Sequence, residues 1–500
     1  MLAPKSIVLV IWQNMEYLNK KLVPYMRDKY STQFIILYAD ENFLEKEWVN
    51  KKDITINMNN LYEKAPLGNI NEKEIFEEAR NFENKYNITY IRDSFLQDRA
   101  YALKFLDVAS NNPLASGKKP DLTKITKEQN YYFNYFEKII SKYAVDLVIA
   151  RPDDVIGFAL NNIAKKLKIP STIQMSTRIP GYMFWPCGGY LNGEQLKIAS
   201  KKINAKSEII LNDDNKIGLS QDKYIRVLSF KATFNEIVFN FKDRVNFLIK
   251  DIKRGKLGKR APLIPKIIFI VKRYMAHRYF QRIFVSDMKI INSRPYIYFP
   301  LPMEPEYNTH SLSKEFINVH AMVQQAAVSL PSGYNIVIKE HTPNIGFKKR
   351  QFYKSLMKLP NLLIVNYILP GTELVDNAAA VMTIAGTAAI EAAERGKMAI
   401  VFASSVEYMH LSNILLGHSM RDLPETIKKA LIPLSKDRKN KIMEEFKILK
   451  QIYKECGYYA PDSPLFSGNS GNSGNIIEKE LVKAVDNLID VWNIQKNISK

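Results

Sequence analysis

Short runs of apolar, β-branched residues alternate with segments of helical spacing along the first part of the chain. The predicted strands span residues 6–12, 33–38, 145–150 and 170–175, and the helices that separate them span residues 15–29 and 158–167. Strands that alternate with helices in this way indicate a parallel sheet with helices on both faces.

The same alternation returns in the second half of the chain. A strand begins near Tyr296, and further apolar runs cover residues 335–339, 362–366, 380–384 and 398–402, with helical segments between them. The pattern predicts an α/β protein with two Rossmann-like, doubly wound domains that face a central crevice.

Five segments follow from these patterns and from local composition. We expect an N-terminal Rossmann-like domain (1–217), a basic helical linker (218–293), a C-terminal Rossmann-like domain (294–465), a flexible Ser-Gly-Asn linker (466–475) and a C-terminal helix (476–500). The last helix is expected to pack on the N-terminal half.

Composition narrows the class of protein. An apolar content of 46% and a charged content of 25% are ordinary for globular domains. Cys187 and Cys456 make no disulfide framework, which suits a reducing compartment. The apolar run near Met1 lacks a preceding basic region, so we interpret it as a first strand and not as a signal peptide. No run reaches the roughly 18–20 apolar residues that span a bilayer.

The net charge of +21 is unevenly distributed. Between Phe241 and Phe284 there are 13 Lys and Arg residues against two Asp, interleaved with aromatic and aliphatic residues. Segments that are both basic and apolar bind anionic membrane surfaces or nucleic acid. The alternative is a solvated basic face on an inserted helical hairpin.

The run from Ala380 to Phe402 predicts a strand, a tight turn, a short helix and a second strand. The N–H groups of Gly386, Thr387 and Ala388 at the start of this helix suit a phosphate. Ligands in such sheets bind at the carboxyl ends of the strands, so this turn and the one that ends strand 335–339 should face one crevice.

Polar residues follow that second strand directly. Lys339 and His341 are candidates to neutralise charge on a leaving nucleotide phosphate, although a lone histidine is more often structural. Glu391, one helical turn after Thr387, is placed to reach ribose hydroxyls, or it is an ordinary helix residue. Motifs for dinucleotides, for ATP loops and for zinc hydrolases are absent from the sequence, and no metal is expected.

In the N-terminal half, Asp153 and Asp154 follow the strand at 145–150. Either is a candidate general base or nucleophile, and the alternative is that one simply caps the next helix. Arg178, in a loop rich in Gly, Pro and aromatic residues, is a candidate to bind carboxylate or phosphate.

Three segments, in this order along the chain, resemble motifs of a known protein family. They are Tyr296-Ile-Tyr-Phe-Pro-Leu-Pro-Met-Glu-Pro-Glu306, Ile338-Lys-Glu-His-Thr-Pro343, and Thr383-Ile-Ala-Gly-Thr-Ala-Ala-Ile-Glu391 with Gly396-Lys397. This set resembles the capsule polysaccharide biosynthesis family, β-Kdo-transferase-like enzymes of the GT-B type that are related to bacterial sialyltransferases. A His-Pro pair of that family is here interrupted by Thr342.

The resemblance implies a CMP-linked donor such as CMP-Kdo, a lipid-linked or glycan acceptor, and a cytoplasmic site at the inner face of the membrane. It also implies that His341 and Thr387 contact the nucleotide phosphate, that Glu391 lies near the nucleoside, and that Glu304 lies at the edge of the crevice. No cofactor beyond the activated sugar is implied.

Together these features predict a metal-independent glycosyltransferase of bacterial surface polysaccharide synthesis. Two alternatives remain open: a sugar-nucleotide epimerase, and a non-catalytic factor of polysaccharide assembly or export that uses the fold as a binding module. A nucleic-acid binder is disfavoured because no recognition motif accompanies the basic segment.

Overall fold

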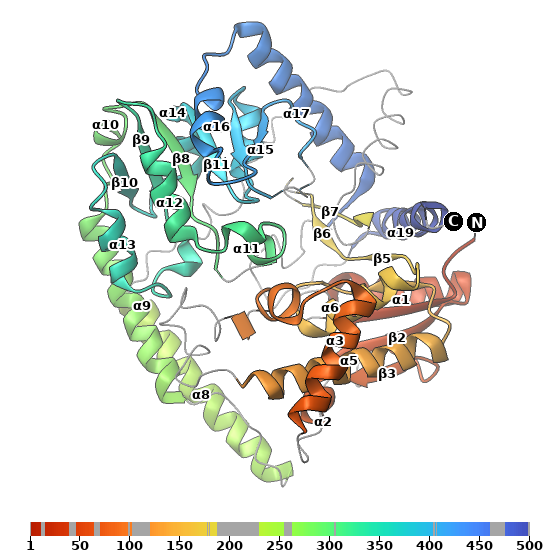
Figure 1. Cartoon of the computed structure of the whole chain (residues 1–500). Coiled ribbons are helices and arrows are strands. Elements are labelled where there is room, and N and C mark those ends of the chain that lie inside the picture. The colour runs from red at the N-terminus through yellow and green to blue at the C-terminus, as the bar shows by residue number, and fades with distance from the viewer. Residues whose placement is uncertain are drawn as a thin grey trace.

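The structure is a computed structural model of the chain. It describes residues 2–11, 16–39, 47–64, 71–98, 101–102, 121–177, 179, 181–187, 230–254, 263–304, 307–403, 406, 408–460 and 476–498. Two parallel sheets lie one above the other, each with its own helices (Figure 1). The expected pair of Rossmann-like, doubly wound domains in a GT-B-like arrangement is therefore confirmed.

The N-terminal sheet has five parallel strands in the order β3-β2-β1-β4-β5. The strands are β1 (Ser6–Ile11), β2 (Gln33–Tyr38), β3 (Ile54–Asn57), β4 (Leu147–Ile149) and β5 (Ser171–Thr172). All six residues of β1 are buried, because a central parallel strand is covered on both faces. Edge strand β3 is mostly half-buried, and the apolar pattern did not predict it.

Helices cover both faces of this sheet. They are α1 (Glu16–Tyr30), α2 (Met58–Lys64), α3 (Glu72–Tyr86), the π-helical turn η2 (Tyr90–Phe95), α5 (Leu122–Lys142) and α6 (Val155–Lys166). α1 buries Leu18, Leu22, Val23 and Met26, which recur at the spacing of one helix face.

The C-terminal sheet has six parallel strands in the order β10-β9-β8-β11-β12-β13. The strands are β8 (Tyr296–Pro300), β9 (Asn335–Lys339), β10 (Leu362–Val365), β11 (Ala380–Thr383), β12 (Ala399–Val401) and β13 (Ile414–Leu416). The chain runs outward from β8 on one side to β10 and then returns to β11 on the other side. The order of the strands therefore reverses between β8 and β11, which makes this the topological switch point.

The remaining elements of this domain are mostly short. They are α10 (Met288–Ile291), α11 (Tyr307–His310), η6 (Lys314–Phe316), α12 (Val319–Val328), η7 (Thr342–Asn344), α13 (Arg350–Leu356), α14 (Gly371–Asn377), α15 (Ala388–Glu394), α16 (Leu423–Ala430) and α17 (Lys436–Cys456).

A small antiparallel sheet joins the two domains. It consists of β6 (Met175–Ser176), β7 (Tyr182–Phe184) and β14 (Gly457–Tyr459), in the order β14-β7-β6. Neighbouring residues of β7 point to opposite sides, so that Phe184 packs in the C-terminal core while Met183 packs in the N-terminal core.

The last helix, α19 (Glu478–Ile498), packs on the N-terminal domain, as the sequence predicts. Leu488 and Ile489 lie in the same core as β1 and α1. The indole N–H of Trp492 donates to the carbonyl oxygen of Asp146, 3.1 Å away.

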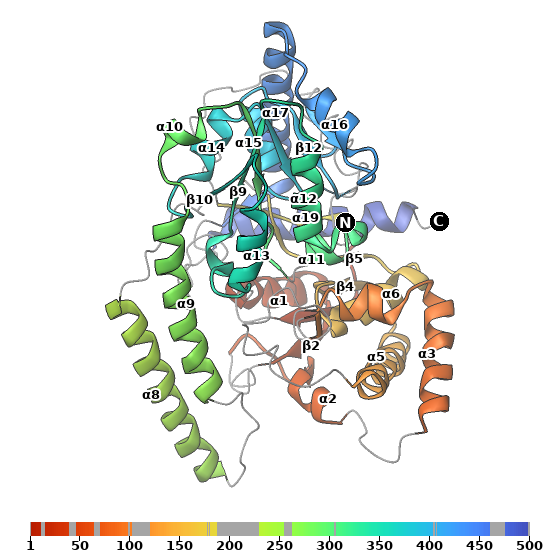
Figure 2. The same cartoon turned by 60° about the vertical axis from the view of Figure 1, so that its left-hand side comes forward.

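Two long helices, α8 (Phe230–Arg254) and α9 (Leu263–Ile283), form a hairpin that stands to one side of the body (Figure 2). α9 packs on the C-terminal domain through Phe280, next to Phe284 just after the helix. None of the helices that the structure describes is long and apolar enough to cross a bilayer.

Candidate functional site

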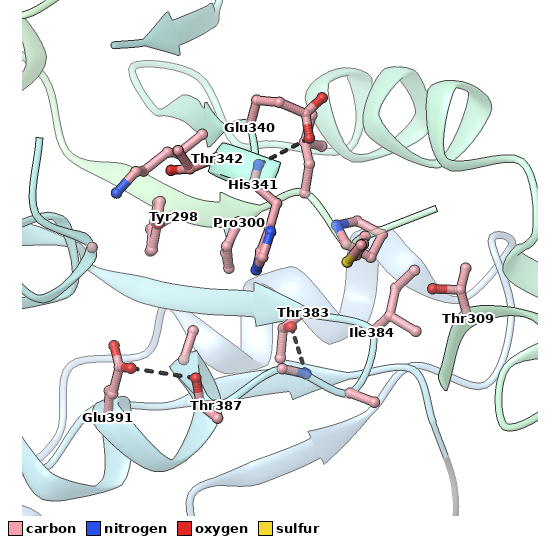
Figure 3. Close-up of a pocket in the computed structure, with 18 of the residues that line it drawn as sticks. Tyr298, Pro300, Thr309, Glu340, His341, Thr342, Thr383, Ile384, Thr387 and Glu391 are labelled. Carbon is pink, nitrogen blue, oxygen red and sulfur yellow. Dashed lines mark hydrogen bonds between the residues drawn. The ribbon is translucent and has the colours of Figure 1, made fainter. Parts of the chain in front are cut away.

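A pocket of about 240 Å³ opens at the carboxyl ends of β9, β8 and β11, around the switch point of the C-terminal sheet. Its walls come from the ends of these three strands, the start of α14, the start of α15 and Thr309 of α11 (Figure 3). Figure 1 shows α11 on the side of the C-terminal sheet that faces the N-terminal domain. The pocket thus lies where ligands bind in open α/β sheets.

His341 is on the wall of the pocket formed by the end of β9. Figure 3 shows its ring pointing into the pocket, towards Thr383 at the end of β11. The backbone N–H of His341 donates to the Glu340 Oε1 atom, 2.9 Å away, so the buried carboxylate holds the turn that presents the imidazole.

Glu340 is itself held by two further groups. Its Oε2 atom accepts from the Tyr353 hydroxyl at 2.6 Å and from the Lys348 ammonium at 3.1 Å. Burial first, and then the charge of Glu340, raises the pKa of the Tyr353 hydroxyl well above its ordinary value. The tyrosine is therefore a fixed donor behind the histidine turn.

Glu304 lies behind the pocket wall and not at the crevice edge where we expected it. Its side chain is 1% exposed, and its Oε2 atom lies 3.0 Å from the Lys348 ammonium. Burial raises the pKa of this carboxyl, and Lys348 opposes the rise. Two buried acids share one buried lysine, because a charge of either sign is costly inside a protein unless it is paired.

The opposite wall is the turn between β11 and α15, where Gly386, Thr387, Ala388 and Glu391 line the pocket. Part of the expected hydrogen-bonding capacity is already used. The Gly386 N–H donates to Thr383 Oγ1 at 3.0 Å, and the Thr387 hydroxyl donates to Glu391 Oε1 at 3.4 Å. An added Cβ on Gly386 would lie 2.5 Å from Thr383 Oγ1, so this turn requires a small residue.

Lys339 also lines the pocket, but its ammonium donates to the Leu369 carbonyl oxygen. It therefore contributes positive charge to the pocket while its position is fixed by the loop before α14.

Asp153 and Asp154 do not line this pocket. Asp154 caps α6: its Oδ1 atom accepts from the N–H groups of Ile156 at 2.9 Å and Gly157 at 2.8 Å. Asp153 forms an ion pair with the Arg151 guanidinium at 2.5 Å, and its side chain is 30% exposed. The capping alternative is the one that the structure shows for Asp154.

Asp154 should make stability depend on pH. Burial, and then the negative charges of Asp153 and Asp98, raise the pKa of this carboxyl to about 8. The hydrogen bond from the Gly157 N–H and the positive charge of Arg151 lower the pKa but do not cancel this rise. In the unfolded chain the carboxyl ionises near its ordinary pKa of about 4. At pH values between about 4 and about 8 the unfolded state therefore binds fewer protons than the folded state. Stability is therefore lost as the pH rises towards the pKa of the folded state.

Asp154→Asn keeps an oxygen for the cap and removes the ionisation. We expect its advantage over the natural chain in the free energy of unfolding to grow with pH, by at most about 1.4 kcal/mol per pH unit. Urea denaturation at several pH values between the two pKa values measures this. Asp154→Ala, which also removes the cap, should be less stable than Asp154→Asn throughout. If the difference in unfolding free energy between Asp154→Asn and the natural chain did not change with pH, the raised pKa of Asp154 would be wrong.

Sequence reasoning missed several residues of the pocket: Tyr298, Thr309, Thr372 and Thr383. Thr383 is the last residue of β11 and could have been found from its place at a strand end. Thr309 reaches the pocket only through the fold of α11. Arg178 lies outside the described residues, as do the expected flexible linker at 466–475 and part of the basic linker.

Within the described ranges, no cluster of His, Cys, Asp and Glu side chains could hold a metal ion. The pocket offers an imidazole, a lysine, several hydroxyl groups and two carboxylates, those of Glu340 and Glu391.

No protein-family model matches the chain, and no curated protein matches it. Among solved structures, it is similar to the UDP-GlcNAc 2-epimerase from Methanocaldococcus jannaschii, with 13% identity, 89% of this chain and 99% of that chain covered, and a TM-score of 0.27. It is also similar to CalG4, the calicheamicin glycosyltransferase, with 12% identity, 99% of each chain covered and a TM-score of 0.28. The assignment of the fold rests on the strand order of the two sheets, and not on these likenesses.

Proposed function

We propose that the protein is a nucleotide-sugar-dependent glycosyltransferase of bacterial surface polysaccharide synthesis. The observation that carries the proposal is the pocket at the switch point of the C-terminal sheet, where the His341 ring points towards the end of β11, and Lys339 and the Gly386–Ala388 turn also line the pocket. This arrangement suits a donor whose phosphate lies between the histidine and the turn.

Each wall has a part in the proposed reaction. His341 donates to, or places positive charge beside, the phosphate that leaves with the nucleotide. The free backbone N–H groups expected at the start of a helix bind phosphate oxygens, and the Thr387 hydroxyl joins them by exchanging Glu391 for the phosphate. Glu391 accepts hydrogen bonds from the ribose. The proposed donor is CMP-linked and carries an acidic sugar such as Kdo, and the proposed reaction uses no metal.

In this proposal the reacting carboxylate comes from the N-terminal domain. Asp153 or Asp154 deprotonates an acceptor hydroxyl, or attacks the sugar itself if configuration is retained. Asp153 is the better candidate, because the Asp154 carboxyl is occupied in the cap of α6 while the Asp153 side chain is partly exposed. The acceptor is a glycolipid or polysaccharide, met at the cytoplasmic face of the inner membrane.

His341→Ala should lower the transfer rate by about 10²–10³-fold, the loss typical of removing one group that stabilises charge in a transition state. The stability of the protein should change little, since the turn is held through the backbone N–H of residue 341. His418→Ala, at an exposed histidine outside the pocket, is the matched control.

The assay combines purified protein with CMP-, UDP- and GDP-sugars and follows release of the nucleotide together with sugar transfer. Nucleotide binding is read separately as a rise in melting temperature. Interconversion of a free nucleotide sugar without an acceptor would favour an epimerase. Binding with neither reaction would favour the non-catalytic assembly factor, and unchanged transfer by His341→Ala would refute the proposed role of the histidine.

A further inference from the structure

The hairpin of α8 and α9 exposes large apolar side chains that a water-soluble helix pair would normally bury. On α8 these are Phe230, Phe234, Phe241 and Val245, and on α9 they are Ile264, Ile268, Val271 and Met275. Phe230 is 71% exposed and Ile264 is 71% exposed. The side chains that the structure describes as buried on α8 are polar, Thr233 and Asn240. On α8 this is the reverse of the distribution in an ordinary surface helix, which buries its apolar side chains.

These residues form one stripe on each helix, and Phe239 of α8 and Ile283 of α9 are exposed outside it. Their spacing is four, seven and four residues on α8, and four, three and four residues on α9. At 3.6 residues per turn, either set falls within about 60° of the helix circumference. On α9, the buried residues Ile270, His277 and Phe280 lie on the opposite side, towards the body.

The two stripes lie next to each other. The ring of Phe230 contacts the ring of Tyr274, with 6.2 Å between the ring centroids, and Tyr274 is adjacent to Met275 of the α9 stripe. Figure 2 shows the two helices side by side, with α8 as the outer one. We call the two neighbouring stripes together the hairpin face.

Positive charge surrounds this face. Lys272, Arg278 and Arg282 are exposed on α9 beside its stripe, and Lys242 is exposed on α8. Two copies of so basic a surface would repel each other. Nucleic acid would leave the aliphatic side chains of α9 without an apolar environment. A partner must neutralise the positive charge and also give the apolar side chains an apolar environment. An anionic bilayer does both, because its phosphates bind the cations and its interfacial region accepts the apolar side chains.

We propose that the hairpin face docks on a bilayer that contains anionic lipid, with the apolar stripes of α8 and α9 inserted at the interface. In the proposed transferase this face is the surface that meets the membrane, but vesicle binding can be measured without sugar transfer.

The docked hairpin is connected rigidly to the loop after His341. A Cβ on Gly346 would lie 2.9 Å from the Arg273 Cα atom, so loop and helix are in direct contact. Phe269 of α9 packs on Phe347, with 4.9 Å between the ring centroids, and Arg350 lies over the ring of Tyr279 at 4.9 Å. Docking of the hairpin therefore also fixes the orientation of the pocket relative to the bilayer.

The test is cosedimentation of the full chain with vesicles of phosphatidylcholine alone or mixed in equal parts with phosphatidylglycerol. The natural chain should bind the mixed vesicles, more weakly as salt is raised. Phe234→Ser with Phe241→Ser, and separately Ile268→Ser with Met275→Ser, should weaken binding by about tenfold or more, because each pair removes inserted apolar area. Phe239→Ser is the matched control: Phe239 is 69% exposed on α8 but lies outside the stripe.

Replacement of Lys272, Arg278 and Arg282 by Glu should abolish the preference for anionic vesicles. All variants should keep the melting temperature of the natural chain and its response to nucleotide, since the altered side chains are exposed. The proposal is overturned if the natural chain does not bind vesicles, if the stripe variants bind as well as Phe239→Ser, or if they instead lose self-association or nucleic-acid binding. Absence of sugar transfer in solution would refute the proposed function and leave the vesicle result standing.

Discussion

Lys348→Met should lower the free energy of unfolding by about 3–5 kcal/mol, the usual cost of removing one partner from a buried ion pair. The Lys348 side chain is 1% exposed, and it is 3.0 Å from Glu304 and 3.1 Å from Glu340. Burial works to lower the pKa of the Lys348 ammonium, but Glu340 and Glu304 outweigh it and the pKa is raised overall. Without this cation, two buried carboxyl groups face each other.

Urea denaturation measures the effect, and Lys349→Met is the matched control because the adjacent lysine is exposed. The deficit of Lys348→Met should shrink as the pH falls, since protonation relieves the two acids. Adding Glu304→Gln and Glu340→Gln should restore most of the stability. If Lys348→Met were as stable as Lys349→Met, the lysine would not be neutralising the two acids.

Gly157→Ala should destabilise the protein by about 3 kcal/mol or more, at the upper end of the usual cost of overpacking. A Cβ at this position would lie 1.6 Å from the Arg151 carbonyl oxygen and 2.8 Å from its carbon. Both are backbone atoms and cannot rotate away. The first turn of α6 would have to move from the loop that carries Asp153, with loss of the Asp154 cap.

Thermal unfolding and soluble yield of Gly157→Ala report this effect. Gly371→Ala, at the first residue of α14, is the control, because the closest atom to its added Cβ is the Tyr298 hydroxyl at an ordinary 3.5 Å. A melting temperature equal to that of Gly371→Ala would show that α6 can shift at little cost.

The sequence predicts most of the two sheets because their central strands are buried on both faces. β1, β8, β9 and β11 are mostly continuous apolar runs, which can be recognised in the sequence between more polar segments. β3 alternates apolar and polar residues, and β13 is apolar but only three residues long; both are half-buried edge strands, and neither was predicted.

The candidate site also contains residues that the sequence predicts and residues that only the structure brings together. His341 and Gly386 follow predicted strands directly, so the rule that ligands bind at the carboxyl ends of strands brings them into one pocket. Glu304 and Lys348 are 44 positions apart and follow no shared pattern. Only the closed tertiary structure shows that their charges pair behind the pocket, which is why Glu304 was expected at its edge.

The position of α19 has a consequence for synthesis on the ribosome. Leu481, Val485 and Leu488 complete a core whose other members include Ile7 and Leu22, at the far end of the chain. The main core of the C-terminal domain, by contrast, ends at Tyr453. The domain that is translated first therefore closes its core last, and until α19 is synthesised part of one apolar face of its sheet stays uncovered.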